Sequence, residues 1–375
     1  MKKHSLLKML LITLLVVVLA SWTLQITTVS GGEFSASDSS IKIGLFNLIS
    51  YLGIVFQYFS QVFVFVLAIG GLYGVLHKIP QYRVLLDKIA DGFKNKEWIF
   101  IVVIGIILSA LSSMAGLSVV LLFLFPFIIS VMLLMGYDKI TAAMLTIGST
   151  IAGLIGSVFS ANDIYGITAV LGHNANELVG FKLLLLVVSL AIVLVNTIFY
   201  GKKHQDRDHI VKGIFVPEKV ETKNKRIFPI VIVMDLLLIV LALAFISWDL
   251  FNVSLFTDMT NKFVNPTGAT AKGIYGAINT VLGISTSNAF GAWTLFEATL
   301  VIVLASWLIS FIYRNSFSKY LSSFGEGAKK ALLPAILAIL SYVVLVCATN
   351  VPFELTILKG ILTLNDGVKV ISMCI

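Results

Sequence analysis

The chain has 375 residues, of which 58% are hydrophobic and only 12% are charged, and its mean hydropathy is +1.00. These values lie far outside the range of soluble globular proteins and predict an all-α polytopic membrane protein. Its 27 basic residues exceed its 19 acidic ones, but the charge lies in short loops between apolar runs, which argues against nucleic-acid binding.

The first elements are an apolar run over 6–20 and a longer run over 46–76. The first could be a signal peptide, but the many spans downstream favour a membrane helix. Residues 25–44 carry more acids than bases and should lie outside. We expect 46–57 to be an interfacial or half-crossing piece and 60–76 to complete the crossing.

Small residues at 70–74 (Gly-Gly-Leu-Tyr-Gly) recur at helical spacing, which predicts close helix packing rather than a binding site. The following stretch, 77–97, interleaves five Lys and Arg residues with apolar residues at roughly helical spacing. This pattern predicts an amphipathic helix on the cytoplasmic surface.

Residues 98–136 are predicted to form a re-entrant hairpin. The apolar arm 98–112 would be roughly 22 Å long as a helix, shorter than a hydrocarbon core of about 30 Å. It is followed by Ser113-Met114-Ala115-Gly116 and a second arm, 117–135. Irregular backbone at membrane depth persists only where protein or a water-filled cavity satisfies it, so the tip should face such a cavity.

An interrupted helix is predicted over 139–163, because small and polar residues fill 147–150 and 153–163. Such residues are costly in lipid unless they face a cavity or a ligand. A hairpin tip opposite an interrupted helix is a recurring way to build a midplane site in secondary transporters. Residues 164–180 should then reach the outer surface.

The span 181–199 should return inward to a basic loop, 201–226, which is the strongest cytoplasmic signal in the chain. This loop separates an N-terminal membrane repeat, 1–200, from a C-terminal one, 227–375. The second repeat has apolar spans over 227–248 and 289–313 on either side of an external polar segment.

The two acids inside these spans, Asp235 and Glu297, are expected near the membrane interfaces, with a buried pair as the alternative.

A second basic amphipathic stretch, 314–330, precedes an apolar run over 331–348. Placing 89–95 over 324–330 aligns the two halves in pattern, although their identity is weak. At this offset the counterpart of Asn162 would lie beyond Ile375. We therefore expect two structural repeats, each with a re-entrant hairpin and an interrupted helix, of which the second is incomplete.

The order of these features resembles the C4-dicarboxylate anaerobic carrier family of the ion transporter superfamily, which includes YfcC-type permeases for dicarboxylates or basic amino acids. The resemblance is carried by the run 70–76, the surface helix, the hairpin, Met135-Gly136-Tyr137-Asp138, and the spacing Gly153, Gly156, Ser160, Asn162. It implies a scaffold domain, a moving transport domain and coupling to Na⁺ or H⁺. Where the family pattern has Asn-Pro, this chain has Asn162-Asp163. The resemblance also implies inverted repeats, whereas the charge pattern places both basic stretches in the cytoplasm.

The leading hypothesis is a multi-pass permease of the plasma membrane for small carboxylate-bearing solutes, either C4-dicarboxylates or amino acids. Half-helix N-termini and hydroxyls would bind the carboxylate, and backbone carbonyls with Asn162 would hold a cation. Helix packing is the alternative role of the serines, and solvation at a loop end is the alternative for Asp163. The candidate substrate-binding residues are Ser112, Ser113, Gly116, Ser149, Ser157, Ser160 and Asn162, and the candidate ion-coupling residues are Asn162 and Asp163.

The expected partners are the lipid bilayer and the solute, and a homodimer is compatible with this interpretation. A P-loop, a nucleophile motif and a His/Cys/Asp metal cluster are absent from the sequence, so we expect neither an enzyme nor a metal site, and no cofactor beyond the coupling ion. The alternative is a non-transporting membrane subunit or an inactive truncated permease.

Overall fold

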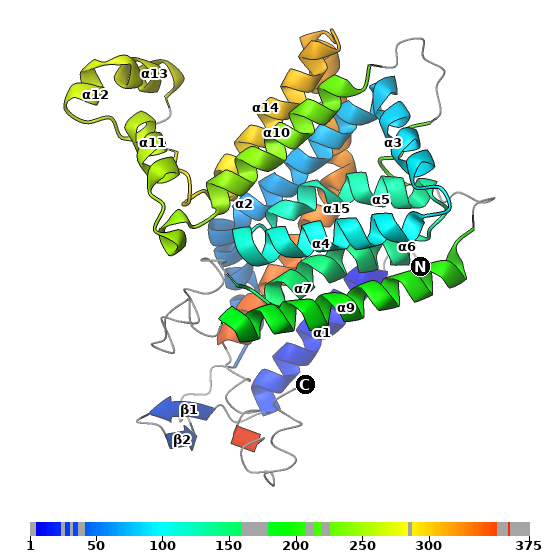
Figure 1. Ribbon diagram of the computed structural model, residues 1–375. Coiled ribbons are helices and arrows are strands. Elements are labelled where there is room, and N and C mark those ends of the chain that lie inside the picture. The colour runs from blue at the N-terminus through cyan, green and yellow to red at the C-terminus, as the bar shows by residue number, and fades with distance from the viewer. Residues whose placement is uncertain are drawn as a thin grey trace. The chain divides into compact units, whose positions relative to one another are not determined.

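A computed structural model describes residues 5–23, 27–30, 33–36, 42–158, 179–206, 213–218, 226–283, 287–350 and 359–360 (Figure 1). These residues are almost all helical. The helices are α1 (Ser5–Thr23), α2 (Leu45–His77), α3 (Pro80–Gly92), α4 (Glu97–Ala115), α5 (Phe125–Leu134), α6 (Lys139–Ala143), α7 (Ser149–Ile155), α9 (Val179–His204), α10 (Phe228–Phe245), α11 (Leu255–Val264), α12 (Ala269–Lys272), α13 (Ile274–Leu282), α14 (Leu295–Ile312) and α15 (Phe317–Asn350).

Three shorter helical pieces and one hairpin complete the described elements. The pieces are two 3-10 helices, η1 (Val120–Phe123) and η3 (Trp248–Phe251), and a π-helical turn, η2 (Met144–Gly148). Strands β1 (Thr27–Ser30) and β2 (Glu33–Ala36) pair antiparallel, with Thr27 opposite Ala36 and Ser30 opposite Glu33.

Seven described helices are long and apolar enough to cross a bilayer: α1, α2, α4, α9, α10, α14 and α15. Large apolar side chains such as Leu236, Ile239 and Leu300 are exposed on them, as expected of surfaces that face lipid rather than water. The prediction of a multi-pass, helical integral membrane protein is therefore confirmed.

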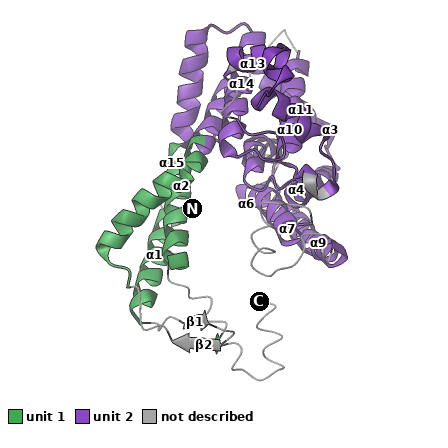
Figure 2. Ribbon diagram, turned by 90° about the vertical axis from the view of Figure 1, so that its left-hand side faces the viewer, with its two compact units in different colours: residues 1–64, 332–375 green, residues 65–331 purple. Residues whose placement is uncertain are grey.

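The chain forms two compact units, 1–64 with 332–375 and 65–331 (Figure 2). In the first unit the Trp22 indole donates to the Ile43 carbonyl (2.9 Å), and the ring of Phe59 stacks on Tyr342 with centroids 4.2 Å apart. These contacts join α1 to the residues that lead into α2, and the N-terminal part of α2 to the C-terminal part of α15.

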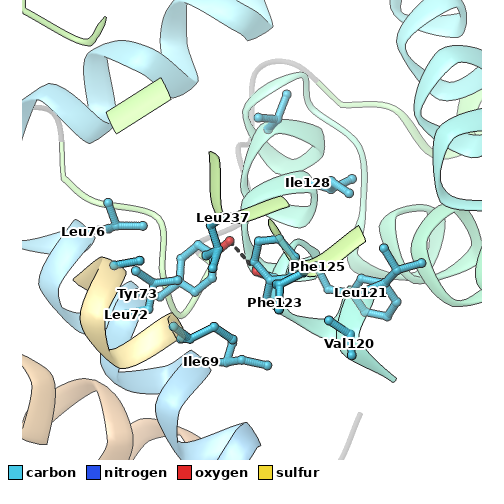
Figure 3. Packing of buried hydrophobic residues seen from close by; sticks show 14 of the residues in the cluster. Ile69, Leu72, Tyr73, Leu76, Val120, Leu121, Phe123, Phe125, Ile128 and Leu237 are labelled. Atoms are coloured by element: carbon cyan, nitrogen blue, oxygen red, sulfur yellow. Dashed lines mark hydrogen bonds between the residues drawn. The ribbon is translucent and has the colours of Figure 1, made fainter. Parts of the chain in front are cut away.

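The core of the second unit lies between α2, α10 and the second arm of the predicted hairpin. Leu72 and Tyr73 of α2, Phe123 of η1 and Leu237 of α10 are buried together (Figure 3). The buried Tyr73 hydroxyl donates to the Phe123 carbonyl (2.7 Å), so this large polar side chain is satisfied inside an apolar cluster.

Glycines bring α2 against the first part of α15. A Cβ on Gly70 would lie 2.4 Å from the Ala331 Cβ, and one on Gly74 would lie 2.4 Å from the Ser323 carbonyl oxygen. Facing them, a Cβ on Gly327 would lie 2.1 Å from the Gly70 carbonyl oxygen. The prediction that 70–74 serves close helix packing is confirmed.

One expected break in a helix does not occur, and a second pair of predicted segments also belongs to one helix. The run from Leu45 to His77 is one helix of 33 residues rather than two pieces, because the polar Gln57 and Ser60 between the expected pieces are compatible with a helix. The basic stretch 314–330 is mostly the first half of α15, a helix of 34 residues. Lys78 forms a salt bridge with Glu326 (2.9 Å), so the two basic stretches meet on one side of the second unit.

The first arm of the predicted hairpin, α4, extends to Ala115 and has 19 residues. This corresponds to about 28 Å, close to the thickness of a hydrocarbon core, so its length no longer indicates that it fails to cross. The second arm is broken into η1 and the ten-residue α5. The re-entrant course of 98–136 stays a prediction.

Thiol labelling tests that topology in a variant whose two native cysteines are replaced by serine. If 98–136 re-enters, Met114→Cys should react slowly with a membrane-impermeant reagent added outside, because the tip stops inside the membrane. Lys262→Cys, in the segment expected to be external and itself exposed, is the control that should react at once. Equally fast external reaction at Met114→Cys would mean two complete spans.

Candidate functional site

The predicted site residues that the structure describes lie where α4 packs against α7, with α9 beside both (Figure 1). A Cβ on Gly153 would lie 2.5 Å from the Ser109 carbonyl oxygen and 2.6 Å from the Ser112 Cβ. On the other side, a Cβ on Gly156 would lie 2.4 Å from the Leu186 Cβ of α9. The small residues therefore allow the three backbones to approach closely.

Both predicted serines of the hairpin tip are buried and bonded to α7 and the residues after it. The Ser112 hydroxyl donates to the Thr150 carbonyl (2.9 Å), and the Ser113 hydroxyl donates to the Gly156 carbonyl (2.6 Å). The Val158 amide in turn donates to the Ser113 carbonyl (3.2 Å). The structure thus brings the end of α4 next to α7. The two hydroxyl hydrogen bonds fix the position of one helix along the other.

Both helices end at this junction. Gly116 ends α4 in the left-handed region (φ 63°), where its amide donates to the Leu111 carbonyl, and Gly156 ends α7. The described ends are therefore helix C-termini, which carry partial negative charge and outward carbonyls. We expected helix N-termini in these two segments, and the structure shows C-termini instead. Small and polar residues indicate where a helix ends, but they do not indicate whether that end is the N-terminus or the C-terminus. Carbonyl-rich ends favour a cation.

Two predicted serines have buried hydroxyls without a partner in the described structure, Ser149 and Ser157. Ser149 lies on α7 facing α4, and Ser157 lies two residues beyond Ile155, the last residue of α7. A buried hydroxyl without a hydrogen bond costs free energy, and a bound ligand or ion is one explanation for such a group. Ser157, beside the carbonyl-rich ends, is the better placed of the two to bind a ligand.

Residues Lys139–Ile155 form one continuous helical run in which η2 is a π-helical turn between α6 and α7, and a break within 139–163 stays a prediction. Hydroxyls inside this run bond back to the preceding turn, Thr146 to the Ala142 carbonyl and Thr150 to the Thr146 carbonyl (both 2.9 Å). Single π turns recur at functional sites, and their widened turn re-aims the residues that follow. No simple residue pattern in the sequence predicts this turn.

Asp138, which belongs to the motif 135–138, has a structural role that the sequence analysis missed. Its side chain caps α6 by accepting from the Thr141 amide (2.8 Å), and it also accepts from the Tyr200 hydroxyl of α9 (3.4 Å). An aspartate one residue before an apolar helical run is the ordinary N-cap signal, which could have identified it.

The acids of the second half have separate positions. Glu297 lies in the first turn of α14, where it accepts from the Thr294 amide and hydroxyl in a capping box, as expected of a residue near an interface. Asp235 is exposed within α10. The described structure shows no contact between the two, so the buried pair is not formed.

Ser160, Asn162 and Asp163 lie outside the described residues, and their roles stay predictions. Within the described part of the chain, no group of three or more His, Cys, Asp or Glu side chains is arranged to hold a metal ion. A cation at the α4–α7 ends would instead be held by carbonyl and hydroxyl oxygens, which suit a hard ion.

Comparison with known proteins gives one match. The family model of the C4-dicarboxylate anaerobic carriers matches residues 40–374. No curated protein and no solved structure matches the chain.

Proposed function

This chain belongs to the C4-dicarboxylate anaerobic carrier family, and we propose that it is a secondary active transporter that moves C4-dicarboxylates across the cytoplasmic membrane using an ion gradient. The match over residues 40–374 carries this proposal and favours a dicarboxylate over an amino acid. The seven apolar helices agree with a carrier embedded in the bilayer.

Sodium is the coupling ion that the geometry supports best. The C-terminal ends of α4 and α7 meet where the Ser113 hydroxyl donates to the Gly156 carbonyl, and the buried Ser157 hydroxyl belongs to the next residue along the chain. The described residues 109–116 and 149–158 contain no titratable side chain, so proton coupling would have to depend on Asp163, which lies outside the described residues. Oxygen ligands at converging helix C-termini instead suit a monovalent cation.

In this proposal the substrate carboxylates bind next to the ion, with Ser149 on α7 and with Ser157 and the predicted Ser160 and Asn162 after it. Ser112, Ser113 and Gly116 shape the other wall, because the two hydroxyls already bond to backbone carbonyls. Asp163 is the nearest acid along the sequence and is assigned to ion coupling.

Uptake into proteoliposomes tests the function directly. We expect saturable uptake of a labelled C4-dicarboxylate that rises with an inward Na⁺ gradient and does not respond to a proton gradient, with no uptake of labelled lysine. Asp163→Asn should change the dependence on Na⁺ more than it changes expression. Uptake of lysine alone would contradict the substrate, proton-driven uptake would contradict the ion, and no uptake of either solute would favour the non-transporting subunit.

A further inference from the structure

A strongly basic pocket lies at one end of α10 and α14 in the second unit. The cavity has a volume of about 610 Å³, and its lining includes four cationic residues and no acidic one. The cations are Lys78, Arg226, Arg314 and Lys319. Lys78 also contacts Glu326, but the other three belong to the segment before α10 and to the turn and helix after α14.

Three helices begin at this pocket. Its lining includes Pro80 in the first turn of α3, Pro229 in the first turn of α10 and Lys319 in the first turn of α15. Each helix start carries partial positive charge and amides that the helix itself does not use. Together with the side chains, these ends create a region of positive potential suited to an anion.

The segments that carry the cations are held in place. The Tyr313 hydroxyl donates to the Arg226 carbonyl (2.6 Å), which ties the segment before α10 to the end of α14. Arg314 has a left-handed backbone (φ 55°), and its amide donates to the Phe311 carbonyl (2.9 Å). A non-glycine residue in this conformation indicates a tight turn that the surroundings enforce.

An apolar groove of about 270 Å³ continues along the same two helices. Its lining is entirely apolar and includes Val233 and Leu236 of α10 and Leu304 and Leu308 of α14. Val233 lies one helical turn from Pro229 of the basic pocket, and Leu308 lies one turn from Ile312, which also lines that pocket. Residues four apart share a helix face, so the groove begins where the pocket ends.

We propose that pocket and groove together bind an anionic phospholipid, with its phosphate among the cations and an acyl chain in the groove. A soluble anion would need only the pocket, whereas the adjoining apolar groove on two membrane-spanning helices matches a lipid. Basic pockets between membrane helices recognise lipid head groups in this way. Arg226, which lines the pocket, ends the basic segment 201–226 that the charge pattern predicts to be cytoplasmic, so we place the lipid in the cytoplasmic leaflet.

Native mass spectrometry of the purified full chain tests the proposal with phosphatidylglycerol and phosphatidylcholine as probes. We expect preferential binding of phosphatidylglycerol, reduced roughly tenfold or more by the double substitution Arg314→Asn, Lys319→Gln. Asparagine tolerates the left-handed backbone at this turn. The matched control is Lys202→Gln, Lys203→Gln, which removes two exposed cations from the last turn of α9 outside the pocket.

A second pair of variants tests the groove. Leu236→Trp should fill it and weaken phosphatidylglycerol binding, whereas Ile239→Trp, on the same helix with a similarly exposed side chain that does not line the groove, should not. Size-exclusion profiles in lipid-free detergent micelles check that every variant folds. The proposal fails if the wild type shows no preference for phosphatidylglycerol. It also fails if glycerol phosphate competes fully while Leu236→Trp has no effect, since the pocket would then take a soluble anion.

Discussion

Replacing Gly327 by alanine is expected to destabilise the second unit, whereas the same replacement at Gly325, two residues earlier in α15, should not. A Cβ on Gly327 would lie 2.1 Å from the Gly70 carbonyl oxygen and 2.6 Å from the Gly74 Cα, and backbone atoms cannot rotate away. Overpacking of this kind costs about 1–3 kcal/mol, and a displaced helix pair costs more.

Gly325 provides the matched control because a Cβ there would meet nothing within 4 Å. Alanine is favoured over glycine in a helix by about 1 kcal/mol, so Gly325→Ala should leave stability unchanged or raise it. The measurement is the folded fraction in detergent after heating, followed by size exclusion. Equal stability of the two variants would mean that α2 and α15 do not pack through these glycines.

The small residues at 70–74 predicted close packing correctly, because small residues at helical spacing are typical of membrane helices whose backbones approach closely. Their partner was not predictable, because Gly327 lies far along the chain and a single sequence carries no information about pairing. The continuity of α2 was missed for a different reason. The stretch from Leu45 is too long for one perpendicular crossing, which suggested two pieces, but a helix can tilt or extend past the hydrocarbon core without breaking.

At the candidate site, composition predicted which segments meet but not how they meet. Serine and glycine clusters at 112–116 and 149–157 do lie together, as their cost in lipid suggested. Whether a helix N-terminus or C-terminus lies at the junction depends on where α4 and α7 stop. In the structure Gly116 and Gly156 are their C-terminal caps. The carbonyl partners of the Ser112 and Ser113 hydroxyls likewise depend on the packing of two helices, which periodicity does not specify.

Ser157→Ala is expected to reduce Na⁺-driven uptake of a C4-dicarboxylate at least tenfold while leaving the thermal stability unchanged. The Ser157 hydroxyl is buried and makes no hydrogen bond in the described structure, so a purely structural role predicts that alanine is neutral or stabilising. If the hydroxyl binds the ion or the carboxylate, its removal should reduce uptake without changing the stability of the fold. The affinity for Na⁺, measured as the half-saturating concentration in uptake, should fall together with the rate.

Two further variants make this result specific. Ser310 on α14 also has a buried hydroxyl without a partner in the described structure but lies outside the site, so Ser310→Ala should change neither uptake nor stability. Ser113→Ala removes the donor to the Gly156 carbonyl (2.6 Å), which should lower stability by about 1 kcal/mol along with uptake. If Ser157→Ala transports like the wild type at every Na⁺ concentration, the end of α7 does not bind the coupling ion. A loss of uptake in Ser310→Ala equal to that in Ser157→Ala would instead trace the effect to helix packing in general.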